Sequence, residues 1–372
     1  MDALKKIILE KIEREWKISF ADFMEAALYY PELGYYERQK PFGKEGSFYT
    51  SVNTSSVFGR CLARSFYYVV SELKLPSYIY EFGAGSGLLA SDILDFYKDH
   101  FNKFYDNLKY YIIEKSSLLI KEQKKLLTKH ISKVEWLGYK DLKNIEGICF
   151  SNELIDAFPV HRIIKIGEDI KELYVINYED KLQFYPDDIV SSELKEFVNK
   201  NQIKLKLIDR QIADINLIAA KWIESLSNAI KRGVIITIDY GDTADKLYNP
   251  YRMDGTVTCY YKHTQNNDFF ERVGEQDITA FVDFTTLIKY AATSNTEKIA
   301  LLPQWQYLLL SGILEDLEKA GSDLERANIK TLIIPAPGFG TNFYVLLQGK
   351  NANVNEKFKY KMTAKDYFNI LK

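Results

Sequence analysis

The chain has 372 residues, a length typical of about two domains, and 47% of them are hydrophobic, which is enough to fill a sizeable core. Lys and Arg number 49 against 51 Asp and Glu, so no overall positive charge attracts nucleic acid or an anionic membrane. We therefore expect no nucleic-acid partner.

The cysteines predict a reducing compartment. Cys61, Cys149 and Cys259 are odd in number and far apart, which favours reduced thiols. His263 lies four residues after Cys259, but no second pair completes a zinc site, so we expect no metal. No apolar run reaches the roughly 18 residues of a membrane span, and residues 1–20 fit neither a secretory signal nor a transit peptide. We expect a cytoplasmic protein without membrane insertion.

The N-terminal part is predicted to be helical. Apolar residues recur at helical intervals over about 3–16 and 20–30, and Ser19 is a plausible N-cap for the second helix. A third helix is expected from Val57 to about residue 73. Residues 1–76 are therefore interpreted as an N-terminal helical subdomain.

A glycine-rich turn follows the first predicted strand. The apolar strand Tyr78–Phe82 is followed by glycines at alternate positions and then by helical spacing from Leu88. The glycines are Gly83, Gly85 and Gly87. They let the backbone lie against a ligand, but Leu88 stands where a dinucleotide fingerprint has its third glycine. The pattern therefore speaks against NAD.

An acidic residue ends the next strand. Residues 109–113 form an apolar run and Glu114 follows, where a carboxylate can accept hydrogen bonds from both hydroxyls of a ribose. Strand, glycine turn, helix, strand and acid together resemble the S-adenosylmethionine (AdoMet) site of class I methyltransferases. A plain βα turn is the alternative.

The strand and helix alternation continues with a helix over 115–128 and strands over 133–137 and 147–153. Asp141 falls between the last two strands, where class I methyltransferases commonly hold the adenine. It is a candidate acceptor for the adenine amino group, or equally a solvent-facing loop acid.

Glu153 ends the strand 147–153, and ligands of open α/β sheets bind at the carboxyl ends of strands. A carboxylate there can bind the N–H groups of a guanidinium acceptor and localise its charge. Glu153, with Asp156 three residues later, is the predicted catalytic pair. The alternative is that Glu153 only caps a helix.

Residues 160–231 interrupt the core. Short alternating runs over 161–189 predict a β-meander, and 191–231 is predicted to be helical. An insertion of this length exceeds ordinary loops, so we expect a substrate-binding cap. The core strand 233–240 follows it.

The C-terminal part completes the sheet. We expect a helix over 305–320 and strands over 331–334 and 342–348, one of them antiparallel. The predicted methyltransferase core comprises residues 77–159 and 232–350, and 351–372 is a polar tail.

Several blocks resemble the MidA-like methyltransferase family over nearly the whole chain. They are Phe23–Pro31, Gly34–Tyr36, Gly46–Thr50, Phe58–Gly59, Glu81–Gly87, Ser151–Val160 and Gly255–Phe284. The resemblance implies a class I AdoMet methyltransferase fold, which is Rossmann-like with a mostly parallel seven-stranded sheet, an N-terminal helical subdomain and a β/α insertion. It also implies AdoMet as cofactor, with Glu81, Thr50 and Asn152 near it.

Mitochondrial members of that family are protein arginine methyltransferases that serve assembly of respiratory complex I. The resemblance thus implies methylation of a protein side-chain nitrogen, with arginine favoured. His263 is a candidate proton acceptor or orienting residue, or equally a structural histidine. The rivals are a small-molecule or nucleic-acid methyltransferase and a non-catalytic assembly factor, and a homodimer is an open expectation.

The chain departs from the family pattern near Thr50. Ser47 replaces the usual Asp, and the usual proline after the threonine is absent from residues 51–54. These changes leave in doubt any contact of that Asp with the AdoMet amino group, and they keep the non-catalytic alternative open.

Overall fold

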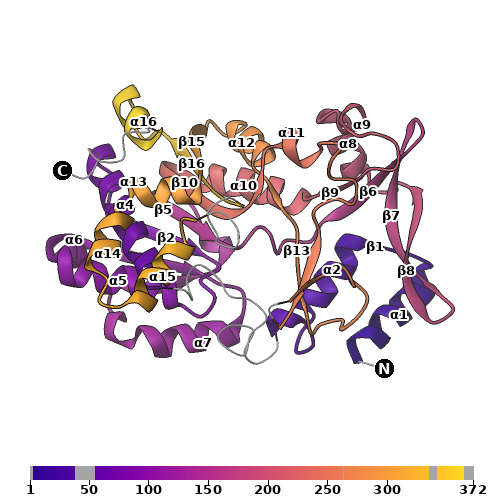
Figure 1. Cartoon of the computed structure of the whole chain (residues 1–372), viewed down its shortest axis with the longest axis horizontal. Coiled ribbons are helices and arrows are strands. Elements are labelled where there is room, and N and C mark those ends of the chain that lie inside the picture. Colours follow the sequence, from indigo (N-terminus) through magenta and orange to yellow (C-terminus); the bar gives the residue numbers. More distant parts are fainter. Residues whose placement is uncertain (1–2, 38–54, 263, 335–341, 364–372) are drawn as a thin grey trace. The chain divides into compact units, whose positions relative to one another are not determined.

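The computed structural model forms two compact units (Figure 1). The residues it describes are 3–37, 55–262, 264–334 and 342–363. Unit 1 holds the described residues of 1–48, 155–222 and 241–287, and unit 2 holds those of 49–154, 223–240 and 288–372. Each unit has its own hydrophobic core.

Unit 2 contains a sheet with the strand order β15-β16-β10-β5-β2-β3-β4. The strands are β15 (Glu297–Pro303), β16 (Phe343–Lys350), β10 (Ile230–Asp242), β5 (Ile145–Asn152), β2 (Tyr78–Phe82), β3 (Lys109–Ile113) and β4 (Val134–Leu137). From β10 to β4 every neighbouring pair is parallel, whereas β16 is antiparallel to both β10 and β15. These seven strands, of which β16 runs antiparallel, confirm the predicted methyltransferase sheet, and the short strand β14 (Val282–Asp283) adds an eighth strand beside β10.

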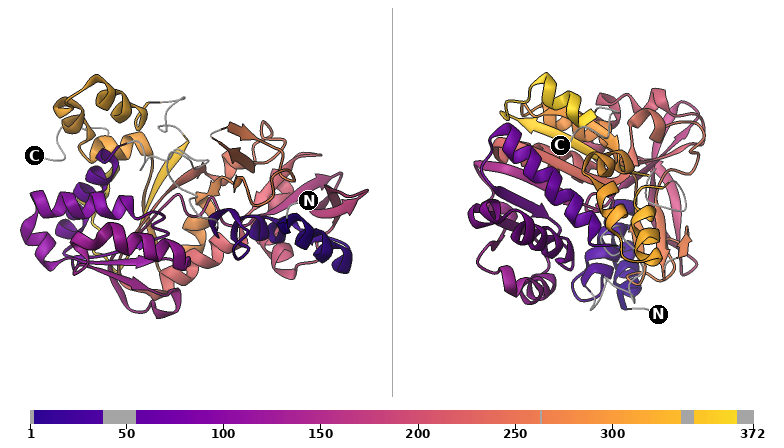
Figure 2. Two further views of the ribbon diagram at one scale, coloured as in Figure 1. Left: turned by 90° about the horizontal axis from the view of Figure 1, so that it is seen from below. Right: turned by 60° about the vertical axis from the view of Figure 1, so that its left-hand side comes forward.

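Helices pack along this sheet (Figure 2). They are α4 (Val57–Leu73), α5 (Leu88–His100), α6 (Asn102–Asn107), α7 (Ser117–Leu126), η2 (Leu127–His130), η3 (Tyr139–Asp141), α13 (Gln304–Leu310), α14 (Ile313–Lys319), α15 (Asp323–Thr331) and α16 (Glu356–Thr363). On α4, Phe58, Leu62 and Phe66 recur every four residues, so they share one face, and all three are fully buried. The Phe66 ring lies 4.9 Å from that of Phe150 on β5.

Unit 1 contains a five-stranded antiparallel sheet and a three-stranded one. Their strands are β1 (Ile18–Ser19), β6 (His161–Ile166), β7 (Asp169–Tyr178), β8 (Lys181–Asp188), β9 (Ile212–Ile215), β11 (Thr258–Tyr261), β12 (Thr264–Asn266) and β13 (Asp277–Thr279). The two-residue strand β14 (Val282–Asp283) pairs in parallel with the last two residues of β10. Strands β6, β7 and β8 are the β-meander predicted from the sequence.

The helices of unit 1 include the two N-terminal ones. They are α1 (Ala3–Glu15), α2 (Phe20–Tyr29), η1 (Tyr35–Glu37), α8 (Ser192–Lys200), α9 (Ile203–Lys206) and α11 (Ala244–Leu247), while α10 (Leu217–Ala229) and α12 (Phe284–Ala292) have residues in both units. Ser19 is the N-cap of α2, as expected, and its hydroxyl accepts a hydrogen bond from Asp22 N at 3.0 Å.

Strand β1 explains why the first helices belong with the inserted sheet. It pairs with β7, with Ile18 opposite Val175, and α1 and α2 share the same core as β7. Residues 1–37 and the insertion therefore lie in one unit, which groups the chain differently from the four predicted segments.

Some predicted elements differ from the observed ones. The predicted strand 331–334 begins at the last residue of α15 and continues into a turn, and the strand beside β16 is β15. The run Thr-Leu-Ile-Ile is β-prone, but α15 is already N-capped by Ser322 and continues into it. Strand β9 lies in a region predicted to be helical, and Gly312, at φ 81°, separates α13 from α14 within the predicted helix 305–320.

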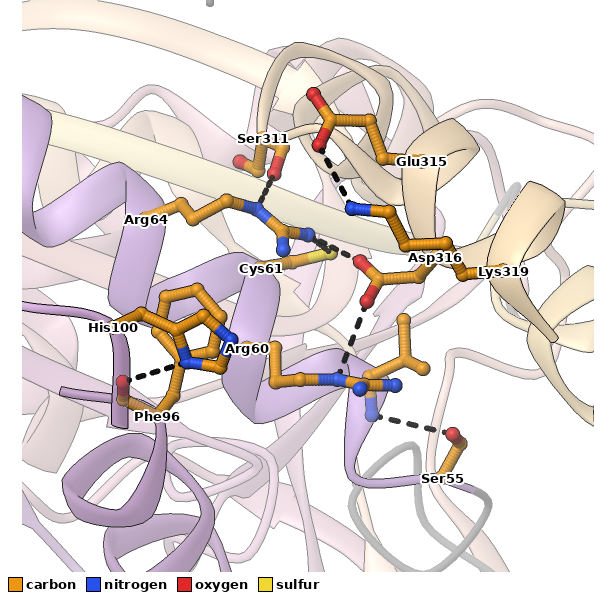
Figure 3. A network of polar contacts seen from close by, with 11 residues as sticks. Ser55, Arg60, Cys61, Arg64, Phe96, His100, Ser311, Glu315, Asp316 and Lys319 are labelled. Atoms are coloured by element: carbon orange, nitrogen blue, oxygen red, sulfur yellow. Dashed lines mark hydrogen bonds and ion pairs between the residues drawn. The ribbon is translucent and has the colours of Figure 1, made fainter. Parts of the chain in front are cut away.

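A buried polar cluster joins α4 to α13 and α14 (Figure 3). Arg64 donates from Nε to Ser311 O at 2.7 Å and from Nη2 to Asp316 and to the sulfur of Cys61. Arg60 Nε lies 3.3 Å from the second oxygen of Asp316. Burial raises the pKa of the Cys61 thiol to about 12, so this cysteine is a packed neutral thiol and not a nucleophile.

Candidate active site

The glycine turn after β2 adopts a conformation that suits glycine. Gly83, Gly85 and Gly87 have φ values of 69°, 52° and 82°, in the left-handed region that strains other residues. A Cβ on Gly83 would lie 2.7 Å from Leu154 Cδ1, and one on Gly87 would lie 3.1 Å from Gln123 Cγ. A side chain at either position would therefore be strained and would displace Leu154 or Gln123, so glycines form the turn as a backbone cradle.

Four parallel strands end at the same edge of the sheet as this turn. Gly83 donates its N–H to Ile113 O at 3.0 Å, which joins the ends of β2 and β3. Phe82 lies opposite Ser151, and Asn152 lies opposite Ile238, so β5 and β10 end there too. The site residues after β2, β3, β5 and β10 are thus gathered at one carboxyl edge.

Glu114 is held close to the glycine turn. Its Oε1 accepts hydrogen bonds from Lys115 N at 2.8 Å and Ser116 N at 3.0 Å. Gln123 Nε2 donates to Glu114 Oε2 at 3.3 Å and to Gly85 O at 2.8 Å. Gln123 thus connects the two predicted parts of the cofactor site.

Glu81 lies on β2, and its side chain is buried. It is 2% exposed and accepts a hydrogen bond from Tyr110 Oη at 2.7 Å. The pKa of Glu81 is raised to about 7, mainly by burial; the hydrogen bond from Tyr110 lowers this pKa, and the nearby charge of Glu114 raises it by a smaller amount. Near neutral pH this acid is therefore partly protonated.

Asn152 and Glu153 form the end of β5. Glu153 has φ 50°, a rare conformation for a residue with a side chain, and its N–H donates to Ile238 O at 3.0 Å. Asn152 Nδ2 donates to Glu153 Oε1 at 3.0 Å, and Asn152 Oδ1 is a buried acceptor with no partner among the described residues. A buried acceptor of this kind suits a ligand that carries donors, such as the amino groups of AdoMet.

Asp239 completes this edge. It lies near the end of β10, is 0% exposed, and accepts hydrogen bonds from Leu154 N at 3.3 Å and Tyr240 N at 2.9 Å. Since Leu154 follows Glu153 directly, Asp239 fixes the backbone on which the predicted catalytic acid stands. The strand pattern of the sequence is sufficient to place Asp239 at this edge, but it does not predict the hydrogen bond from Leu154 N to Asp239.

Asp156 belongs to unit 1 and is 4% exposed; its carbonyl accepts a hydrogen bond from Ala280 N at 2.9 Å. Another buried acid of unit 1, Asp277, accepts a hydrogen bond from Tyr36 Oη at 3.0 Å. Burial raises the pKa of Asp277 to about 6. The structure thus brings together two family blocks that are about 240 residues apart.

The other predicted site residues lie apart from this edge or outside the described chain. Asp141 is exposed and closes its own turn by accepting from Gly138 N at 3.0 Å, so its adenine contact stays a prediction. His263, Thr50 and the departures at Ser47 and residues 51–54 lie outside the described residues.

Gln123 was not predicted from the sequence. Its signal is a glutamine on the apolar face of an amphipathic helix, between Leu119 and Leu127 at four-residue spacing, where both leucines are buried. Within the described ranges, no group of three or more His, Cys, Asp or Glu is arranged to hold a metal ion.

A family model described as "Putative S-adenosyl-L-methionine-dependent methyltransferase" matches residues 61–301, which is more than half of the chain. The chain belongs to this family. The matched residues include the glycine turn, Glu114 and the end of β5. The family match therefore covers the same edge of the sheet at which the structure gathers the predicted site residues. The residues present fit AdoMet through the glycine cradle and the buried Asn152 acceptor.

Curated relatives of this methyltransferase chain cover most of its length. The Caenorhabditis elegans "Protein arginine methyltransferase NDUFAF7 homolog, mitochondrial" is 26% identical over 77% of the chain and 72% of the relative. The Mus musculus "Protein arginine methyltransferase NDUFAF7, mitochondrial" is 28% identical over 76% of the chain and 68% of the relative.

A crystal structure from Burkholderia thailandensis, bound to S-adenosyl-homocysteine, superposes with a TM-score of 0.87 and 23% identity over 98% of this chain and 95% of that one. This similarity supports the methyltransferase fold.

The expectation of a cytoplasmic location is wrong, because the named relatives, including those of worm, mouse and human, are mitochondrial proteins. The three cysteines are free and buried. No helix in the described part of the chain has the length and apolar character needed to span a bilayer.

Proposed function

We propose that this methyltransferase transfers a methyl group from AdoMet to a protein side-chain nitrogen, with an arginine guanidinium as the acceptor. The names of the relatives supply the acceptor class, since several are protein arginine methyltransferases. AdoMet supplies an electrophilic methyl group when bound. The remaining work of the protein is to hold the cofactor, orient the acceptor and receive a proton.

The cofactor would be held by the glycine turn, by Glu114 on the ribose and by Asn152. Turn N–H groups and the start of α5 can lie against the cofactor, because the left-handed glycines expose the backbone. Glu81 and Thr50 remain predicted cofactor-binding residues, and Asp141 remains the predicted acceptor for the adenine amino group.

The proposed binding of the guanidinium acceptor depends on Glu153. A non-glycine residue at φ 50° costs free energy, and such strain persists at functional sites when the surroundings enforce it. Here Asn152 holds the carboxylate and Asp239 holds the following N–H. A carboxylate fixed in this way can accept two N–H groups of a guanidinium and leave the third nitrogen to attack the methyl group.

The parts assigned to unit 1 extend this proposal. Residues 160–231, which hold β6 to β9, stay the predicted acceptor-binding cap, Asp156 stays a predicted catalytic acid, and His263 stays a predicted proton acceptor or orienting residue. A homodimer and the absence of nucleic-acid binding also stay predictions.

The test is the variant Glu153→Gln, which keeps the size of the side chain and removes its charge. We expect AdoMet affinity within about threefold of the parent, and transfer of labelled methyl groups to protein in a mitochondrial extract lowered about 100-fold. Glu122→Gln, an exposed acid on α7, is the matched control and should change neither.

Three outcomes would overturn parts of the proposal. Transfer at the parental rate by Glu153→Gln would remove the role assigned to this residue. Label in RNA or in small molecules, with none in protein, would favour the rival acceptors. AdoMet binding without any labelled product would favour a non-catalytic assembly factor.

A further inference from the structure

Gln123 is a buried polar residue in the wall of the cofactor site. It lies on α7, is 0% exposed, and has the buried Leu119 and Leu127 one turn before and one turn after it. Burying an amide without hydrogen bonds costs free energy, so a leucine would suit this helix face better if only packing counted. The polar side chain therefore points to a requirement other than packing.

Both polar atoms of the Gln123 amide form hydrogen bonds. Nε2 donates to Gly85 O at 2.8 Å and to Glu114 Oε2 at 3.3 Å, and Oε1 accepts from Trp136 Nε1 at 2.8 Å. A flipped amide would set its oxygen against a carbonyl and a carboxylate, and its NH₂ against the indole N–H. Only one orientation satisfies all three partners.

The bond to Gly85 orients the glycine turn. In a trans peptide the C=O and the following N–H point in opposite directions. Because the Gly85 carbonyl faces Gln123, the Ser86 N–H is directed away from α7. Glycines retain many backbone conformations, and this hydrogen bond selects one of them.

The bond to Glu114 fixes the second part of the site. Glu114 Oε1 is held by the N–H groups of its own loop, and Gln123 holds Oε2. One side chain thus sets the distance between the glycine turn and the predicted ribose acid, and Trp136 on β4 keeps that side chain in place. Arranging a site before the ligand arrives lowers the entropy lost on binding.

We propose that Gln123 is a positioning residue for AdoMet, which locks the glycine turn and Glu114 in their binding arrangement through one doubly donating amide. The proposal rests on the AdoMet site of the proposed function and is independent of the acceptor. Gln123 acts through the turn and Glu114.

The experiment compares three variants in the full chain by calorimetric titration with AdoMet and by thermal unfolding. Gln123→Met keeps the length and removes every hydrogen bond, and Gln123→Glu keeps an acceptor for Trp136 but removes the donors. Gln211→Met is the matched control, because Gln211 is also 0% exposed and donates from Nε2 to three backbone carbonyls, but in unit 1.

We expect the dissociation constant of AdoMet to rise at least tenfold in both Gln123 variants and to stay within about threefold of the parent in Gln211→Met, although all three variants unfold at lower temperature. Without ligand, the amides of residues 83–92 should exchange hydrogen faster in Gln123→Met than in the parent. This local readout separates positioning from a general loss of stability.

Gln123→Met and Gln123→Glu with parental AdoMet affinity would overturn the inference, and so would an equal loss of affinity in Gln211→Met. If Gln123→Met does not fold, Gln123→Glu and its exchange pattern decide. Failure of the parent itself to bind AdoMet would instead contradict the proposed function, so the two failures are distinguishable.

Discussion

Glu81, a predicted cofactor-binding residue, makes the stability of the protein depend on pH. Its pKa is raised from 4.5 to about 7, mainly by burial, while the Tyr110 hydrogen bond lowers the pKa and the charge of Glu114 raises it by a smaller amount. An acid with a raised pKa binds its proton more tightly in the folded chain than in the unfolded one. The free energy of unfolding therefore falls as pH rises from about 4.5 to about 7, and the loss is complete above that range.

Glu81→Gln should remove this pH dependence. The amide oxygen can still accept from Tyr110, but nothing titrates, so the variant should gain stability over the parent as pH rises, by up to about 3 kcal/mol above pH 7. Urea unfolding between pH 5 and 8 measures the difference. Glu135→Gln, an exposed acid on β4, should leave the pH profile unchanged; a parallel profile for Glu81→Gln would contradict the assignment.

At the scale of elements, α4 depends on a buried ion pair for its attachment to α14. The side chains of Arg64 and Asp316 are 14% and 8% exposed, and Arg60 lies on the other oxygen of Asp316 (Figure 3). Removing one partner of a buried pair leaves the other charge uncompensated. The cost is therefore much larger than for an exposed pair.

Asp316→Asn should lower the free energy of unfolding by about 3 kcal/mol. Glu315→Gln is the matched control, since Glu315 is the preceding residue, is 57% exposed, and meets Lys319 at 3.8 Å. Its loss should cost less than about 0.5 kcal/mol. Denaturant titration of both variants measures the contrast, and equal small effects would show that the buried cluster contributes little.

The two units of the whole molecule divide the predicted site residues between them. Glu153 and the described cofactor-contact residues lie in unit 2, whereas Asp156 and the inserted sheet lie in unit 1. The two units have separate hydrophobic cores. A ligand that binds only the folded state stabilises the unit that holds it. AdoMet should therefore act on the unfolding of unit 2.

AdoMet at 100 times its dissociation constant should stabilise unit 2 by about 2.7 kcal/mol and raise its unfolding temperature by roughly 5 °C or more. NAD at the same concentration should have no effect, because Leu88 replaces the third glycine of a dinucleotide site. Scanning calorimetry measures both ligands. An upward shift with NAD and none with AdoMet would refute the reading of the glycine turn.

Local sequence patterns were enough to predict the elements of the proposed cofactor site and their order. Strand, glycine turn, helix and acid are adjacent in the chain, and the rule that parallel strands end at one edge placed Glu114 and Glu153 at the same edge. Local patterning was sufficient because these elements depend on periodicity and on glycine conformations. It failed at residues 331–334, where a capped helix overrode β propensity.

Contacts between residues distant in the chain could be found only from the packed structure. It linked Gln123 to Gly85, Glu114 and Trp136, it buried Glu81 against Tyr110, and it paired β1 with β7. A sequence pattern gives the face of a helix or strand on which a side chain lies, but not the atom that it meets there. Hydrogen bonds and pKa shifts depend on that atom and on burial, and both are fixed only when the elements pack.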